Sequence, residues 1–90
     1  ANGDVILGFS APWCGYCRSL RPMIEKLSEE ISQPIYGLNC DVDEEITKRY
    51  EVETIPTLIY FHDGQPKDRI IGYGTVGYPQ LKEFIEKNSK

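Results

Sequence analysis

The spacing of apolar residues changes abruptly on either side of Trp13. Before it, residues 5–9 form a short apolar run with β-branched side chains, which is typical of a strand buried on both faces. After it, apolar residues recur at intervals of three and four, which is the spacing of one face of a helix. They are Cys17, Leu20, Ile24, Leu27 and Ile31. The chain must therefore place a buried strand and an amphipathic helix end to end, which is typical of an α/β fold.

The rest of the sequence repeats this alternation. Further strands are expected at residues 35–40, 57–61 and 67–72, and further helices at residues 43–50 and from Pro79 onward. Asp43 is the expected N-cap of the short helix. Asp63-Gly64 predicts a tight hairpin turn between the last two strands. The predicted order is βαβαββα.

This order predicts a four-stranded mixed sheet flanked by three helices. Strands joined through helices are expected to lie parallel, and the Asp63-Gly64 turn adds an antiparallel edge strand. Near-continuous apolar strands need cover on both faces of the sheet. A chain of 90 residues has the length of one domain, so we expect a single domain over residues 1–90.

Composition argues against several partners. Ten Lys and Arg against fourteen Asp and Glu give a net charge of −4, which disfavours binding to nucleic acid or to an anionic membrane surface. No apolar run approaches the roughly 18 residues of a membrane helix, and no signal peptide is recognisable. Three cysteines leave at least one thiol unpaired within the chain. The unpaired Cys40 favours a reducing compartment, so we expect a cytoplasmic protein.

The most informative motif is Trp13-Cys14-Gly15-Tyr16-Cys17, at the point where the first strand leads into the first helix. Catalytic groups of α/β sheets gather at such strand ends. Free N–H groups at a helix N-terminus favour an anion, so Cys14 is expected to be an exposed thiol with a lowered pKa. Cys17, one turn further on, is expected to be shielded and able to form a disulfide with Cys14. Such a pair combines a nucleophile with a resolving thiol.

Other interpretations of these cysteines are weaker. A zinc site needs a second pair of ligands, and only Cys40 and His62 remain, so no metal is expected within the chain. A metal shared between two chains is a further alternative. A purely structural bridge would close a very short loop and add little stability. We expect Cys40 to be buried as a small apolar side chain, and His62 to be solvated on the hairpin.

Several motifs together resemble the thioredoxin family. They are Phe9-Ser10-Ala11-Pro12-Trp13-Cys14-Gly15-Tyr16-Cys17, the helix proline Pro22, Asp41-Val42-Asp43, Ile55-Pro56-Thr57 and Asp63-Gly64. The resemblance runs from about Asp4 to the C-terminus. It implies a minimal thioredoxin fold and a thiol–disulfide oxidoreductase that acts on protein or small disulfides without a bound cofactor.

The resemblance also implies roles for particular residues. Cys14 would attack a substrate disulfide, and Cys17 would resolve the resulting mixed disulfide. Pro56 would follow a cis peptide bond, and the backbone of Ile55 would pair with the substrate chain. The other substrate-binding positions would be Trp13, Gly15, Tyr16 and Gly74, with Gly72 as the competing glycine. The implied partners of the monomeric protein are disulfide-containing proteins and a thioredoxin-reductase-like electron donor.

Three departures from the family pattern bear on function. Tyr16 replaces the proline of the family's common reductant and resembles a periplasmic disulfide isomerase, so the direction of electron flow stays open. Many relatives begin with one more strand and helix, so the strand at residues 35–40 is expected at the edge of the sheet. Gly8 and Gly37 stand where relatives have a buried Asp and Lys beneath the cysteines.

Two alternative functions share this fold. The first is a disulfide isomerase or oxidase that uses the same two cysteines. The second is a redox-silent module that holds peptides at Ile55-Pro56. The presence of both Cys14 and Cys17 disfavours the second, because such modules lose these cysteines freely.

Overall fold

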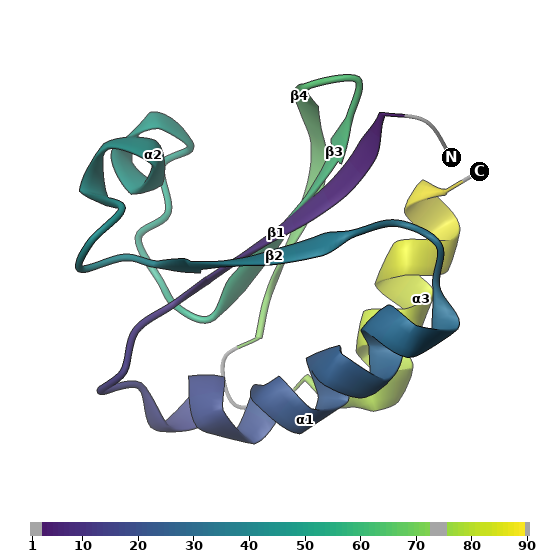
Figure 1. Cartoon of the computed structure of the whole chain (residues 1–90), viewed down its shortest axis with the longest axis horizontal. Coiled ribbons are helices and arrows are strands. Elements are labelled where there is room, and N and C mark those ends of the chain that lie inside the picture. Colours follow the sequence, from purple (N-terminus) through teal and green to yellow (C-terminus); the bar gives the residue numbers. More distant parts are fainter. Residues whose placement is uncertain (1–2, 73–75, 90) are drawn as a thin grey trace.

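The computed structural model describes residues 3–72 and 76–89 (Figure 1). Its elements follow the predicted order. The strands are β1 Asp4–Ser10, β2 Ile35–Asn39, β3 Thr57–His62 and β4 Gln65–Ile71. The helices are α1 Gly15–Glu30, α2 Glu44–Arg49 and α3 Tyr78–Asn88. The predicted four-stranded mixed sheet with three helices is confirmed.

The strands lie in the order β2-β1-β3-β4. β1 is parallel to β2 but antiparallel to β3, and β3 is antiparallel to β4. The prediction that all strands joined through helices lie parallel is therefore wrong for β3. The connection over residues 40–56 does not cross back along the sheet, because β2 ends at Asn39, opposite Ser10, and β3 begins at Thr57, opposite Phe9. β3 therefore enters the sheet at the end where β2 leaves it.

Two apolar cores cover the two faces of the sheet. In β3, Leu58 and Tyr60 join the core formed with α1 and α3, whereas Ile59 and Phe61 join a second core, which α2 covers. Figure 1 shows α1 and α3 on one side of the sheet and α2 on the other. This two-sided burial explains why β3 is a continuous apolar run. Of the strands described, β2 lies outermost on its side, as the sequence predicts.

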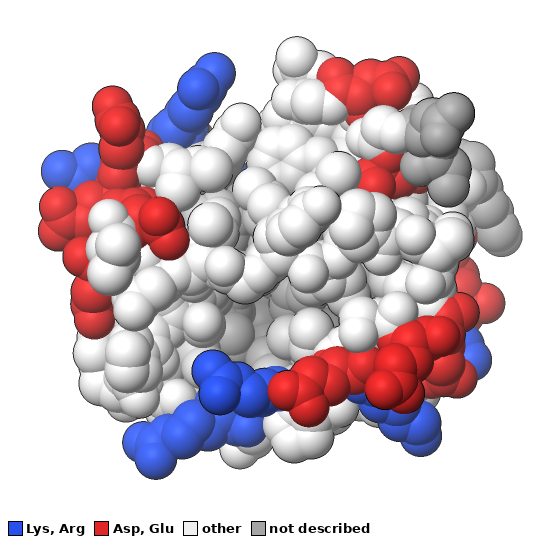
Figure 2. All heavy atoms as spheres, in the orientation of Figure 1, with Lys and Arg blue, Asp and Glu red and all other residues white. Residues whose placement is uncertain are grey.

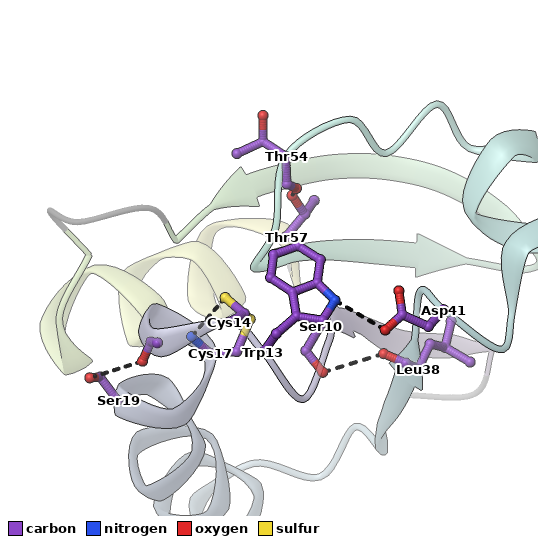
Figure 3. Close-up of a disulfide and its surroundings, with 10 residues drawn as sticks. Ser10, Trp13, Cys14, Cys17, Ser19, Leu38, Asp41, Thr54 and Thr57 are labelled. Atoms are coloured by element: carbon purple, nitrogen blue, oxygen red, sulfur yellow. Dashed lines mark hydrogen bonds between the residues drawn. A yellow bond between two sulfur atoms is a disulfide. The ribbon is translucent and has the colours of Figure 1, made fainter.

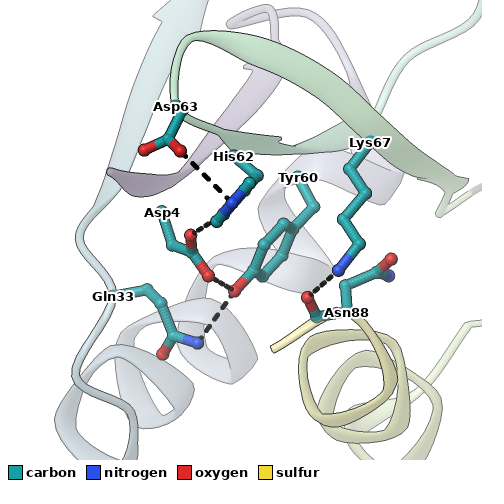
Figure 4. A network of polar contacts seen from close by, with 7 residues as sticks. All are labelled: Asp4, Gln33, Tyr60, His62, Asp63, Lys67 and Asn88. Carbon is teal, nitrogen blue, oxygen red and sulfur yellow. Dashed lines mark hydrogen bonds and ion pairs between the residues drawn. The ribbon is translucent and has the colours of Figure 1, made fainter. Parts of the chain in front are cut away.

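A buried polar cluster lies where β1 begins (Figure 4). The carboxylate of Asp4 is 4% exposed and accepts hydrogen bonds from the Tyr60 hydroxyl and from Nδ1 of His62, each at 2.5 Å. Nε2 of Gln33 donates to the Tyr60 oxygen at 3.0 Å. The bond from Tyr60, and then that from His62, lowers the pKa of Asp4, whereas burial raises the pKa of Tyr60.

His62 only partly matches its predicted solvated position. Its side chain is 55% exposed, but Nδ1 contacts Asp4 and Nε2 lies 3.3 Å from a carboxylate oxygen of Asp63. The imidazole therefore links the hairpin to the first residue of β1. Hairpin position alone does not reveal this contact, because Asp4 lies 58 residues earlier in the chain.

Candidate active site

The turn from β1 into α1 positions both cysteines of the C-x-x-C motif (Figure 3). Cys14 is the N-cap of α1, and its backbone N–H donates to the carbonyl of Ala11 at 3.1 Å. Its Sγ accepts a hydrogen bond from the backbone N–H of Cys17 at 3.2 Å. The sulfur therefore satisfies one of the free N–H groups of the first turn, as an oxygen of Ser or Asp does at other helices.

Cys14 and Cys17 form a disulfide, with their Cα atoms 5.3 Å apart. That separation lies within the usual range for a bridged pair. Cys40 is a free thiol and is partly buried against the α2-side core. Cys40 packs against apolar side chains, as predicted, but it is only partly buried and not fully buried as expected.

The exposure of the two cysteines is the reverse of the prediction. Cys14 is buried, at 6% exposed, whereas Cys17 is partly exposed. The Cys14 sulfur is turned back toward the first turn, where the Cys17 N–H holds it. Cys17 borders a cavity beneath α1, so this cavity gives solvent access to it. The expected order of exposure is therefore wrong for this oxidised form.

Exposed aromatic side chains stand on both sides of Cys14. Trp13 is 67% exposed and Tyr16 is 46% exposed. Between Tyr16 and the capping cysteine lies Gly15, where an added Cβ would meet no atom within 4 Å. The surface beside the disulfide is therefore apolar and sterically open.

Asp41 was expected only as part of a solvated acidic start of the second helix, but it contacts the active site. Its Oδ2 accepts a hydrogen bond from Nε1 of Trp13 at 3.0 Å (Figure 3). Its backbone N–H donates to Oδ1 of Asn39, the last residue of β2, at 2.9 Å. Asp41 therefore ties the indole to the end of the neighbouring strand. The only sequence signal was that Asp41 and Trp13 follow two adjacent strands.

Asp43 occupies the predicted N-cap position of α2, but its side chain makes no capping bond to that helix. Its Oδ2 instead accepts the backbone N–H of Asn39 at 3.1 Å. Asp43 thus stabilises the turn that follows β2 rather than the helix start.

The loop before β3 contains the predicted cis peptide bond, between Ile55 and Pro56. Pro56 is buried and borders the same cavity as Cys17, and Ile55 is partly buried against the α2-side core. The carbonyl of Pro56 accepts the backbone N–H of Gly72 at 2.8 Å. A Cβ at Gly72 would lie 2.6 Å from Cδ1 of Leu20, so this glycine is closely packed. Gly74, the other predicted glycine, lies outside the described residues.

The described residues give two further findings. No helix among them is long and apolar enough to span a bilayer. In residues 3–72 and 76–89, no group of three or more His, Cys, Asp or Glu side chains is arranged to hold a metal ion.

A disulfide at the start of a helix, at the end of a central strand, is the arrangement expected of a thiol–disulfide oxidoreductase. Comparison with known proteins agrees. The sequence model of the family described as Thioredoxin matches residues 1–87. The chain is 40% identical over 89 residues to a thioredoxin of Staphylococcus aureus, covering 97% of this chain and 84% of that protein. The chain belongs to the thioredoxin family.

Two further similarities support this assignment. Over 85 residues the chain is 39% identical to an M-type chloroplast thioredoxin of Pisum sativum, covering 92% of this chain and 48% of that protein, so it spans about half of that relative. The solved structure of a mutant thioredoxin from Halobacterium salinarum superposes with a TM-score of 0.89 at 30% identity, covering 99% of this chain and 77% of that chain. The predicted thioredoxin fold and oxidoreductase class are confirmed.

Proposed function

We propose that this chain reduces disulfides in proteins by a cycle between its Cys14–Cys17 dithiol and disulfide. The thiolate of Cys14 attacks one sulfur of the substrate disulfide, forming a mixed disulfide and releasing the other substrate sulfur as a thiolate. The thiolate of Cys17 then attacks Sγ of Cys14 and releases the second substrate thiolate. Two electrons pass to the substrate, and the Cys14–Cys17 disulfide forms.

One observation carries this division of roles. Sγ of Cys14 accepts the backbone N–H of Cys17 at the N-terminus of a 16-residue helix. A negative sulfur is favoured there by the same N–H group and by the helix dipole. The opposite roles receive no such support, because Cys17 lies inside the first turn.

The proposed substrate surface comprises Trp13, Gly15, Tyr16, Ile55, Pro56 and Gly74. The exposure of Trp13 and Tyr16 supports it, since an extended substrate chain needs an apolar surface beside the attacked sulfur. The open space at Gly15 supports close approach of that chain. We further propose a monomer in a reducing, cytoplasmic compartment that is recharged by a thioredoxin-reductase-like donor, consistent with the free thiol of Cys40.

Alkylation of the reduced protein tests these roles. Iodoacetamide near neutral pH should label Cys14 before Cys17 and Cys40, because its thiolate fraction is the largest. Cys14→Ser should abolish reduction of insulin disulfides, and Cys17→Ser should accumulate mixed disulfides. Faster labelling of Cys17 or Cys40 would show that the nucleophile has been misassigned.

The direction of electron flow is tested by the reduction potential of the Cys14–Cys17 pair in a glutathione series. A value of about −270 mV is expected of a reductant, and one of about −120 to −180 mV of an oxidant or isomerase. Tyr16, exposed between the two cysteines, is the residue that favours the second outcome. A potential in that higher range would replace the reductase by an isomerase or oxidase.

A further inference from the structure

A cavity of about 580 Å³ lies between α1 and the β2–β1 side of the sheet. Figure 2 shows this face of the molecule hollowed between β2 and α1. The volume falls within the roughly 300–1,000 Å³ of small-molecule sites. Its apolar wall includes Leu20 and Ile24 of α1, Ile35 of β2 and Leu58 of β3.

A pair of glycines makes this space. Gly8 of β1 and Gly37 of β2 are direct partners in the parallel ladder, and both line the cavity. A Cβ at Gly37 would meet no atom within 4 Å, and one at Gly8 would meet only the carbonyl oxygen of Tyr36, at 3.8 Å. A side chain would therefore fit at both positions, and steric crowding does not explain why they are glycines. Glycine within a strand weakens it and often marks a place where a ligand approaches closely.

The mouth of the cavity carries charge that is not neutralised. Arg18 and Arg21 of α1 border it, and among the described residues neither guanidinium has a hydrogen-bond or ion-pair partner. The carboxylate of Glu25, one turn further along, also borders the cavity, so these three side chains sum to one positive charge.

Two polar side chains that line the cavity nearer the sheet already make hydrogen bonds within the protein. The Ser10 hydroxyl donates to the carbonyl of Leu38 at 3.4 Å, and Oδ1 of Asn39 accepts the N–H of Asp41. The interior therefore offers mainly apolar contacts, and the strongest polar attraction is toward an anion at the mouth.

We propose that this cavity binds a small organic anion with an apolar body, of the class of medium-chain aliphatic carboxylates. The apolar chain lies between α1 and the Gly8–Gly37 pair, and the carboxylate lies at Arg18 and Arg21. This site adjoins the surface proposed for disulfide substrates, because Cys17 and Pro56 form part of its wall.

Titration of the oxidised wild-type protein with decanoate, followed by amide NMR, tests the site directly. Saturable shifts are expected at the amides of Gly8 and Gly37. Decanol has a similar chain without the charge and should bind about twofold to thirtyfold more weakly, since two exposed ion pairs are lost. Absence of saturable shifts at both glycines, or equal binding of decanol and decanoate, would refute the proposal without recourse to any variant.

Variants then separate the apolar from the charged part. Gly37→Leu should weaken decanoate binding at least about tenfold by filling the space, given the transfer energy of a buried leucine-sized group. The double change of Arg18 and Arg21 to Gln should remove the preference for decanoate over decanol. The matched control changes Lys48 and Arg49 to Gln, which removes two positive charges from α2 on the other face of the sheet. It should preserve that preference.

Unchanged decanoate affinity in folded Gly37→Leu would place binding elsewhere. If that variant does not fold, the smaller Gly8→Ala change serves the same purpose. Loss of the preference for decanoate in the Lys48 and Arg49 control would show that net charge, not the position of Arg18 and Arg21, attracts the anion. Either result would overturn the proposal.

Discussion

Strand β1 meets a polar site at each end, and the two sites are built differently. At its start, Asp4 is buried and bonded to Tyr60 and His62, which lie 56 and 58 residues away in the sequence. After its end, the sulfur of Cys14 is bonded to a backbone group only three residues away. The first site ties distant strands together, whereas the second depends on one helical turn. Stability and chemistry are therefore separated along a single strand.

The strongest test of this separation is Cys14→Ser. We expect disulfide reduction to be abolished because the attacking sulfur is gone. The urea midpoint of the reduced protein should change little, since the serine hydroxyl can accept the Cys17 N–H in the same way. Insulin reduction and urea unfolding, both with reduced proteins, measure the two quantities. A large loss of stability would mean that the two ends are not independent.

Tyr60→Phe tests the other end. It removes the hydroxyl that serves both Asp4 and Gln33 in a buried place, so the free energy of unfolding should fall by about 1–3 kcal/mol. Disulfide reduction per folded molecule should remain that of the wild type. The matched control is Tyr36→Phe, whose ring is 56% exposed and should leave the urea midpoint unchanged. Equal effects of the two changes would contradict a structural role for the cluster.

The pH dependence of stability sharpens the same contrast. The pKa of Asp4 is lowered from its ordinary value of 3.8, chiefly by the hydrogen bond from Tyr60. Its contribution is therefore complete well above pH 3.8 and is lost as pH falls through the lowered folded value. Asp4→Asn should be less stable than wild type at neutral pH, and the difference should shrink in acid. Urea midpoints from neutral pH to about pH 2 measure this.

Asp68 also affects that comparison, because its pKa is lowered as well, first by the hydrogen bond from Asn88. Protonation of Asp68 in acid should lower the stability of wild type and of Asp4→Asn alike. Subtracting the urea midpoint of one protein from that of the other at each pH removes this shared contribution. A difference that stayed constant with pH would show that Asp4 does not titrate with folding.

The smallest effect is expected for Asp41→Ala, which removes the hydrogen bond to Trp13 on the surface. Stability should fall by no more than about 1 kcal/mol because both groups are largely exposed. Trp13 is the single tryptophan, so its fluorescence should report the freed indole directly. Glu44→Ala, a nearby exposed carboxylate, is the control. Identical fluorescence in Asp41→Ala and wild type would mean that the indole is held by other contacts.

The sequence predicted what local spacing controls and missed what distant contacts control. The helix that follows Cys14, the hairpin at Asp63-Gly64 and the reactive pair are determined by neighbours a few residues apart. The direction of β3 depends on the path of the residues between β2 and β3, which apolar spacing does not encode. The hydrogen bonds from Tyr60 to Asp4 and from Trp13 to Asp41 join segments that come together only in the folded sheet. No local sequence pattern therefore predicts them.

The relative exposure of Cys14 and Cys17 was predicted wrongly for a related reason. Their positions on the first turn follow from sequence, but access to Cys17 depends on the space beneath α1. That space exists because Gly8 and Gly37 become partners across two strands. Local spacing does not indicate that these two glycines will face each other, and only the family resemblance placed them together beneath the cysteines.

The same glycine pair has a consequence for local unfolding. β2 is the outermost strand beside β1, and none of its five residues is fully buried, whereas the first five residues of β3 are. Without side chains at Gly8 and Gly37, little packing toward α1 opposes separation of β2 from the sheet. We therefore expect the amide hydrogens of β2 to exchange through local openings that leave β3 closed. A molecule held beneath α1 that binds only the closed form would raise the free energy of that opening by an amount set by its concentration and its affinity.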